Sequence, residues 1–264
     1  MAFQIENGVL KKYSESPDEN EIIIPDGVTE IGEDAFRDCI NLVKISIPNS
    51  VIKIGDGAFC DCAKLESVAI PDSIEEIGSY ALAGCVNLKR IVIPNSVEVI
   101  ENELFEDDKN LIEVKIPESV TEINTCAFMG CEKLTSIDIP DSVSFIGDEA
   151  FKGCKELKEI TIPDGIDCIQ KGTFSGCISL TKVTIPDSVW WIDAEAFAGC
   201  ESLSDITIPD SVTDVGDEAF VGCINLAGLN IPESVTEIGD DAFAFDEPWE
   251  DDDEDDEEDD EDDE

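Results

Sequence analysis

Histidine is absent from this sequence, methionine occurs only twice, and no lysine or arginine follows Lys182. Histidine is the commonest general base near neutral pH, so its absence argues against the usual nucleophilic sites. No stretch approaches the ~20 apolar residues of a membrane-spanning helix. The first residues, MAFQIENGVLKKYSES, lack the apolar run of a signal peptide. We therefore expect no membrane insertion and a cytoplasmic protein; the alternative is secretion or surface display by a route that the sequence does not reveal.

Acidic residues dominate the sequence and are distributed unevenly. The 264 residues include 64 aspartates and glutamates against 16 lysines and arginines, for a net charge of −48. Residues 183–264 carry −30 of this charge and no basic residue. Such a field repels phosphate backbones, so we expect no nucleic-acid binding and predict protein partners, with basic proteins as natural counterparts. Every residue from Glu250 to Glu264 is acidic, and such a run is expected to be extended and disordered.

The dipeptide Ile-Pro recurs ten times at intervals of 23 residues. We call each unit that begins at such an isoleucine a coil, number the coils from one to ten, and count positions as offsets from that isoleucine. Aliphatic residues recur at offsets 4, 7, 18 and 21, Ala-Phe at offsets 11–12 and cysteine at offset 15. The ten isoleucines are Ile24, Ile47, Ile70, Ile93, Ile116, Ile139, Ile162, Ile185, Ile208 and Ile231.

The spacing within a coil predicts its local structure. Apolar residues at offsets 18, 21 and 0 indicate a strand, which the Pro-Asp-Gly of residues 163–165 would end in a turn. Offsets 4–7 predict a second, shorter extended segment. In coil six, Asp148 is placed to cap one helical turn over residues 149–151, which Gly153 would end. Stacking buries the apolar side of each coil and aligns equal offsets as a parallel sheet. We therefore expect an α/β repeat solenoid, rich in β structure, with a short second strand and one helical turn per repeat.

The two ends of the stack depart from the repeat, as the ends of a solenoid must if its core is to be closed. Residues 1–23 are predicted to be an N-terminal cap, in which Asn7-Gly8 joins the two strands of a hairpin. Residues 24–245 are the ten repeats, and residues 246–264 are the acidic tail.

The unit I-P-x-S-V-T-x-I-G-x-x-A-F-x-G-C-x-x-L-x-x-I-x closely resembles the BspA-like class of leucine-rich repeats, over roughly residues 24–245. The resemblance implies a right-handed leucine-rich-repeat solenoid. Members are typically bacterial or protist proteins thought to mediate adhesion and protein–protein contact, many of them at the cell surface. The lack of a recognisable export signal departs from that picture.

Offset 3 also departs from commoner leucine-rich repeats, which place asparagine there. Eight coils have serine at this offset, for example Ser50, Ser142 and Ser211, and two have glycine, Gly27 and Gly165. We expect the serine hydroxyls to form a hydrogen-bonded ladder along the stack.

Eight of the eleven cysteines form a column at offset 15, and the interpretation that requires least is a row of buried, free thiols. Stacked neighbours lie within the distance range of a disulfide, but parallel side chains would have to distort to form one. Cys60-x-Cys62 is a poor zinc spacing, and no histidine can assist, so we predict no metal and no cofactor. No catalytic cluster stands out, and we predict no enzyme. The column comprises Cys39, Cys62, Cys85, Cys131, Cys154, Cys177, Cys200 and Cys223, with Asp108 and Asp246 in the remaining places.

Aromatic residues break one polar column. At offset 6, where most coils have glutamate or aspartate, coils six to eight have Phe145, Cys168 and Trp191, and Trp190 lies beside them at offset 5. Exposed tryptophan and phenylalanine are typical binding anchors. The alternative is that local packing half-buries them.

Basic residues gather around the main strand, on the face expected to be concave. A solvated face of mixed charge is the alternative to a binding role. Coil four departs further, because Glu101 replaces glycine and Asp108 replaces cysteine, and we expect a local bulge there. The basic candidates are Lys44, Lys89, Arg90, Lys115, Lys158 and Lys182.

These observations favour a non-enzymatic scaffold that binds proteins through the concave sheet face and the aromatic stripe of Phe145, Trp190 and Trp191. Two alternatives remain: an acidic chaperone or decoy for basic proteins that acts through the tail, and a bacterial surface adhesin.

Overall fold

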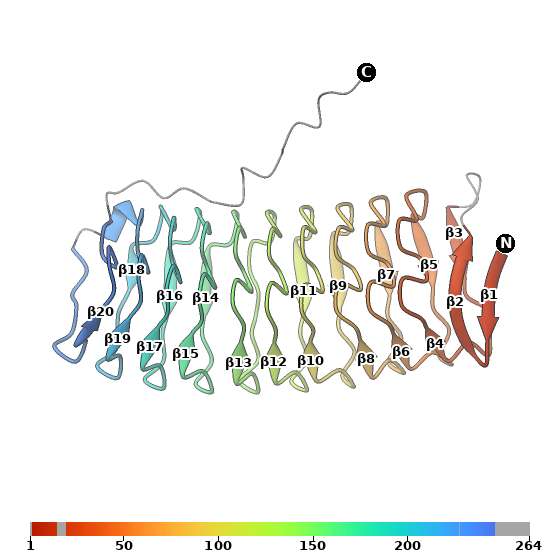
Figure 1. Cartoon of the computed structure of the whole chain (residues 1–264), viewed down its shortest axis with the longest axis horizontal. Coiled ribbons are helices and arrows are strands. Elements are labelled where there is room, and N and C mark those ends of the chain that lie inside the picture. The colour runs from red at the N-terminus through yellow and green to blue at the C-terminus, as the bar shows by residue number, and fades with distance from the viewer. Residues whose placement is uncertain (1, 15–19, 227, 246–264) are drawn as a thin grey trace, which may run out of the picture.

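The protein, in a computed structural model that describes residues 2–14, 20–226 and 228–245, is a row of stacked coils (Figure 1). The hairpin at the N-terminus lies at one end of the row and coil ten at the other. The predicted acidic tail, residues 246–264, lies outside the described residues. Residues 15–19 of the predicted cap lie outside them too.

Each regular coil contributes one main strand and one second strand, and most strands at equal offsets pair in parallel and in register, although the main strands β7 and β9 do not pair. The main strand β3, within the range assigned to the cap, pairs with β5 like the later main strands. The main strands are β3 (Glu21–Ile23), β5 (Lys44–Ser46), β7 (Ser67–Ala69), β9 (Arg90–Val92), β11 (Glu113–Lys115), β14 (Glu159–Thr161), β16 (Lys182–Thr184) and β18 (Asp205–Ile206). The second strands are β4 (Glu30–Ile31), β6 (Lys53–Ile54), β8 (Glu76–Ile77), β10 (Val99–Ile100), β12 (Glu122–Ile123), β13 (Phe145–Ile146), β15 (Cys168–Ile169), β17 (Trp191–Ile192), β19 (Asp214–Val215) and β20 (Glu237–Ile238).

A hairpin of β1 (Ala2–Glu6) and β2 (Val9–Ser14) closes the N-terminal end. Asn7 and Gly8 form its turn, with φ of 52° and 83°, the left-handed region that Asn-Gly favours. β2 then pairs in parallel with β4, so the hairpin continues the ladder of second strands. Tyr13 is buried against Phe36, with ring centroids 5.2 Å apart. The hairpin thus covers the apolar end of coil one.

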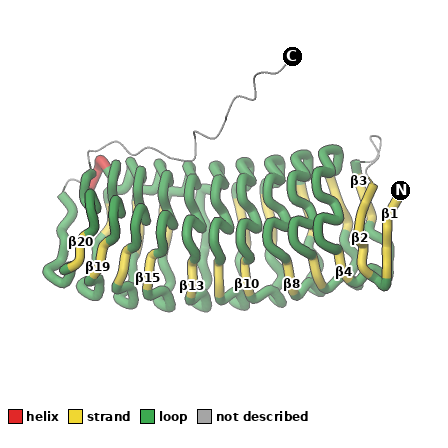
Figure 2. The backbone as a smooth tube through the Cα atoms, viewed as in Figure 1, coloured by secondary structure: helices red, strands yellow, loops and turns green. Residues whose placement is uncertain are grey.

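The core is a set of rows that run along the stack, one row for each apolar offset. The phenylalanines at offset 12 are buried in coils one to nine, Phe243 of coil ten is partly buried, and neighbours stack at centroid distances of 5.1–5.6 Å. Coil three interrupts this row, because Leu82 takes the place of phenylalanine. The core therefore extends along the whole stack, and only short pieces of each coil are strand (Figure 2).

The predicted helical turn is wrong. Among the described residues, helix occurs only as the short 3₁₀ segment η1 (Ile224–Leu226), so the fold is a β-solenoid and not an α/β structure. In coil six, Glu149 has φ of 55°, which an α-helix does not tolerate. The backbone N–H groups of Glu149, Phe151 and Gly153 donate to carbonyls of coil seven at 2.8–2.9 Å. Lys152 N–H, between them, closes a turn onto the Glu149 carbonyl at 3.0 Å. Bonds between coils replace the bonds of a helix.

The serine ladder is confirmed in five coils and is wrong in three, where the buried hydroxyls of Ser50, Ser211 and Ser234 have no hydrogen-bond partner among the described residues. In the five coils the hydroxyl at offset 3 donates to the carbonyl at offset 4 of the preceding coil, at 2.6–2.7 Å in four of the five bonds. Each bond crosses from one coil to the next, so the ladder stabilises the stack. The donors are Ser73, Ser96, Ser119, Ser142 and Ser188.

The ladder of second strands opens at two junctions. Strand β8 of coil three does not pair with β10 of coil four, and β13 of coil six does not pair with β15 of coil seven. At these junctions the backbone N–H groups of Glu101 and Gln170, at offset 8, lack the bond to the preceding coil that Gly147 and Asp193 make at 2.8 Å. The irregularity expected in coil four is therefore a gap in pairing.

The residue at offset 8 explains both gaps. A Cβ on Gly147 would lie 2.6 Å from the backbone nitrogen of Thr125 in coil five, closer than atoms can approach. A side chain at this offset is therefore crowded against the preceding coil, although Asn124 and Asp193 keep their backbone bond to it. Each gap falls where a larger residue first follows glycine: Glu101 follows Gly78, and Gln170 follows Gly147. Within the pairs of coils four and five, and seven and eight, both members lack glycine and the ladder continues.

Candidate binding surface

The three exposed aromatic residues lie together on the second-strand surface of coils six to eight. Phe145 in β13 is 40% exposed, Trp190 is 46% exposed, and Trp191 in β17 is half-buried. The two tryptophan rings lie 5.8 Å apart and are tilted by 31°. We call Phe145, Trp190 and Trp191 the aromatic patch. It spans the second gap in the ladder.

Cys168 lies between the flanking aromatic residues and is buried, so it does not belong to the exposed surface. At offset 6, Cys168 is a small residue between two large ones, Phe145 and Trp191. Burial is the main cause that raises the pKa of its thiol to about 12. Carboxylates on three successive coils raise it further: Asp193, Asp167 and Asp148.

Acidic side chains flank the aromatic patch along the stack. The backbone N–H of Trp190 donates to the Asp167 carbonyl at 3.0 Å, which places these two residues side by side on adjacent coils. Trp191 is paired in register with Asp214 of coil nine. Within residues 2–14, 20–226 and 228–245, the ion pairs of the structure do not involve Asp148, Asp167 or Asp193.

The predicted basic residues lie on the main-strand face, and all are exposed. Two of them pair with an acid on the next coil: Arg90 Nε lies 3.4 Å from Glu113, and Lys182 Nζ lies 3.5 Å from Asp205. The face is therefore one of mixed charge, and its cations do not form a single cluster. The remaining candidates, Lys44, Lys89, Lys115 and Lys158, are distributed along coils one to six.

Two hollows occur on this face where coil five has no main strand. The segment Ser136–Asp138 lies between β11 and β14 without pairing to either. Cavities of about 410 and 180 Å³ lie on its two sides. A larger cavity of about 550 Å³ lies at the first gap in the ladder of second strands, lined by Glu75, Glu76, Ser96, Glu98 and Glu101 among others.

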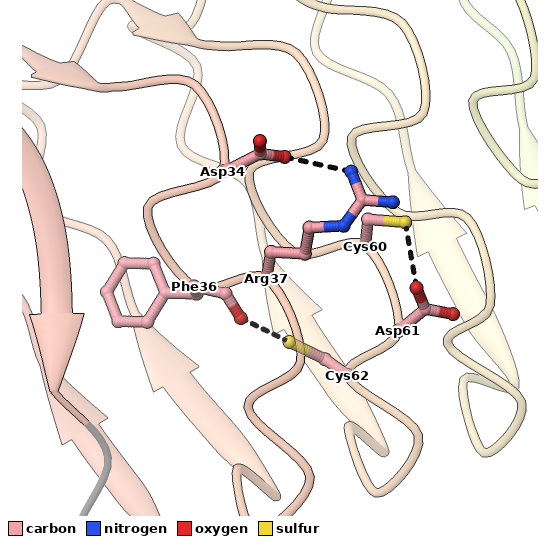
Figure 3. A network of polar contacts seen from close by, with 6 residues as sticks. All are labelled: Asp34, Phe36, Arg37, Cys60, Asp61 and Cys62. Atoms are coloured by element: carbon pink, nitrogen blue, oxygen red, sulfur yellow. Dashed lines mark hydrogen bonds and ion pairs between the residues drawn. The ribbon is translucent and has the colours of Figure 1, made fainter.

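The cysteine column is buried, as predicted, and has a hydrogen-bonding role. The Cys62 thiol donates to the carbonyl of Phe36 at 3.1 Å, and Figure 3 shows this bond beside the contact of Cys60 with Asp61. Seven thiols of the column make the equivalent bond to the residue at offset 12 of the preceding coil, at 3.1–3.3 Å. Each of these carbonyls also accepts the backbone N–H at offset 15 of its own coil, so the thiol adds a second bond, which crosses to the next coil.

Asp108 takes the place of a thiol in coil four. It is completely buried, and neither carboxylate oxygen has a hydrogen-bond partner among the described residues. Burial raises the pKa of Asp108 well above its usual range, and nearby Asp107 adds to this, while the Cys85 backbone opposes it. The raised pKa favours the neutral form of Asp108 in the folded protein. Its titratable neighbours in the column are the thiols of Cys85 and Cys131.

No group of three or more cysteine, aspartate or glutamate side chains is arranged to hold a metal ion within the part of the chain that the structure describes. None of the described helical segments is long and apolar enough to cross a membrane. Sequence reasoning identified the aromatic patch but missed Gln170 and the aspartates around Cys168. Gln170 interrupts a glycine column and could have been found from the sequence.

Comparison with known proteins agrees with this architecture. The model of the BspA type leucine rich repeat region matches residues 11–135 and 121–247, in six copies. A leucine-rich repeat protein from Bacteroides ovatus is 29% identical, with a TM-score of 0.54 over 85% of this chain and 77% of its own. The T. pallidum leucine-rich repeat protein is 30% identical, with a TM-score of 0.53 over 75% of this chain and 83% of its own. No curated protein matches the sequence.

Proteins with such repeats are generally non-enzymatic scaffolds, and the matched residues cover nearly all of the described stack. The chain belongs to the BspA type leucine-rich repeat family.

Proposed function

We propose that the protein is a non-enzymatic scaffold that binds protein partners through the aromatic patch. The observation that carries this proposal is the exposure of Phe145 and Trp190 beside Trp191 on a stacked β surface. The same offsets elsewhere are mostly threonine, serine or acidic residues, so the stack does not need aromatic rings there. Large exposed aromatics on a preformed surface are typical of binding anchors. The main-strand face, with its lysines and hollows, is the secondary contact surface.

Capture of partners from native lysate tests the proposal. The baits are the wild-type chain and a double variant, Trp190→Thr and Trp191→Val, which uses residues found at these offsets in other coils. We expect the double variant to lose the specific partners while its thermal unfolding stays close to wild type. Capture of the same partners by both baits would contradict the proposal.

An acidic chaperone or decoy for basic proteins is the second candidate, and the fifteen consecutive acids of residues 250–264 favour it. Binding through such a run is electrostatic and weakens steeply with salt. Deleting residues 250–264 separates the candidates. Binding that survives the deletion at moderate salt supports the scaffold, and binding that vanishes supports the tail.

We propose a reducing, cytoplasmic location, which the eleven free thiols support. A bacterial surface adhesin is the rival. Fractionation of native cells decides between them: detection of the protein on intact cells by surface labelling would contradict the cytoplasmic placement.

A further inference from the structure

The charged residues at offsets 5 and 6 around the aromatic patch are all acidic, and the nearby Lys171, at offset 9 of coil seven, pairs with Glu195. Asp167 lies beside Trp190 on the adjacent coil, Asp214 is in register with Trp191, and Asp193 follows in the next turn. At offsets 5 and 6 of coils five to ten, the sequence has no basic residue. The carboxylates near the patch therefore repel one another, and within the described chain none of Asp148, Asp167 and Asp193 has a cation to relieve that repulsion.

We propose that the aromatic patch binds arginine side chains presented by an extended, basic segment of a partner protein. This proposal rests on the scaffold function and names the chemistry of the partner. A guanidinium group is planar, so it can stack on an indole face while its N–H groups donate to a carboxylate at the ring edge. The patch offers both features within one surface: two tilted indoles and aspartates on the adjoining coils.

Arginine fits this surface better than lysine or an apolar group. An ammonium group attracts the same carboxylates but is more strongly hydrated and cannot stack as a plane. A purely apolar partner would cover the aspartates without pairing them, which is costly. A phosphate-bearing or acidic partner would be repelled by the same charges. An extended segment matches a surface whose equivalent positions repeat every ~4.8 Å along the stack.

The test measures binding of a labelled peptide in which arginine alternates with serine, by fluorescence anisotropy at ~0.15 M salt. Two further peptides replace every arginine with lysine or with glutamine. All measurements use the full chain, so that the acidic tail is present equally in every variant. The variants are Trp190→Thr with Trp191→Val, and separately Asp167→Asn.

Two control variants match these changes elsewhere on the surface. Asp141→Asn removes one exposed acid from coil six away from the patch. Tyr80→Asn removes an aromatic side chain that is 42% exposed in coil three, and asparagine tolerates the positive φ of 57° at that position. Thermal unfolding of each variant verifies that it is folded.

We expect the arginine peptide to bind at least ~5-fold more tightly than the lysine peptide, and the glutamine peptide not to bind. The double tryptophan variant should weaken arginine binding ~10-fold or more, and Asp167→Asn ~5-fold. The two controls should change it less than ~2-fold. Equal weakening by Asp141→Asn and Asp167→Asn would show that only net charge matters and would overturn the proposal, as would full binding by the double tryptophan variant.

The same variants separate this inference from the scaffold function. Loss of lysate partners by the double tryptophan variant, together with unchanged binding of the arginine peptide, would leave the scaffold standing and overturn the arginine proposal. If both are unchanged, both proposals fall.

Discussion

The junction between coils three and four and the junction between coils six and seven share one backbone feature and differ in their side chains. In both, a larger residue at offset 8 follows glycine and the ladder of second strands opens. At the first junction the opening is a cavity of about 550 Å³ lined by four glutamates. At the second, the buried Cys168 lies at offset 6 between Phe145 and Trp191 of the neighbouring coils. The gap is thus a property of the backbone. The side chains that line it are those at offsets 5 and 6, and they differ between the two junctions.

The cores beneath the two junctions differ as well. Phe151 and Phe174 stack across the second junction with centroids 5.6 Å apart and planes 5° from parallel. Beneath the first, Leu82 interrupts the phenylalanine row and Asp108 replaces a thiol. Burial, with a hydrogen bond that protonated Glu106 donates to Glu103, also raises the pKa of Glu106 on the same coil to about 7. The first junction is therefore the weaker joint of the solenoid, and the second is locally intact.

The largest expected effect comes from breaking the intact row. Phe151→Ala should lower the free energy of unfolding by ~3–5 kcal/mol, because a fully buried ring leaves a cavity that the stack cannot close. Trp190→Thr, at an exposed position nearby, should change it by less than ~1 kcal/mol. Urea unfolding followed by circular dichroism measures both. Similar losses for the two variants would mean that the inward and outward offsets are wrongly assigned.

Repairing the weaker joint should have the next largest effect. Asp108→Cys restores the side chain that the other coils use, which can donate to the carbonyl at offset 12 of coil three. An unsatisfied buried polar group costs ~1–3 kcal/mol, and we expect a stabilisation of that size at pH 7 in urea unfolding. A destabilised variant would show that Asp108 makes a favourable interaction in coil four.

The pH dependence of stability tests the protonation of Asp108. Its pKa is raised in the folded state, so above pH ~4 the folded chain keeps a proton that the unfolded chain releases. The stability contributed by this group is therefore complete below pH ~4 and falls as the pH rises toward the folded-state pKa, by ~1.4 kcal/mol per pH unit.

The difference in stability between wild type and Asp108→Asn, measured by urea unfolding at several pH values, isolates this dependence. Asp141→Asn, an exposed acid in coil six, controls for the general relief of charge repulsion on acidification. A difference that does not vary between pH 4 and pH 7 would show that Asp108 is ionised in the folded protein.

Closing the second gap should have the smallest effect. Gln170→Gly permits coil seven to approach coil six and restore one or two backbone bonds worth ~0.5–1.5 kcal/mol each. The conformational freedom of glycine in the unfolded chain offsets ~0.5–1 kcal/mol of this gain. We expect a net change within ~1 kcal/mol, together with altered tryptophan fluorescence as the aromatic patch shifts. Unchanged fluorescence would mean that Gln170 does not hold the gap open.

The 23-residue period was sufficient to predict the stack, the two strands of each coil and the buried rows, because each depends on the residues that recur at one offset. The helical turn was wrong for a physical reason. Asp148 before Ala150-Phe151 has the composition of a helix start, but the residue between has positive φ and its amide bonds to the next coil. A pattern read within one coil does not show bonds made between coils.

The candidate site was predictable only in part. Phe145, Trp190 and Trp191 could be identified because they break polar columns, and their exposure follows from the offsets. The lack of an ion pair at Asp167 and Asp193 could not be predicted, because it depends on which cations reach that surface in the folded chain. The gaps required knowledge of how closely glycine at offset 8 approaches the preceding coil.

Amide hydrogen exchange of the native protein tests the central claim, that the ladder opens where a larger residue at offset 8 follows glycine in the preceding coil. The amides of Asn124 and Asp193 donate to the preceding coil at 2.9 and 2.8 Å, and those of Glu101 and Gln170 do not. All four are non-glycine residues at the same offset, so they form a matched comparison. We predict rapid exchange at Glu101 and Gln170 and strong protection at Asn124 and Asp193. Equal protection at the four positions would contradict the account.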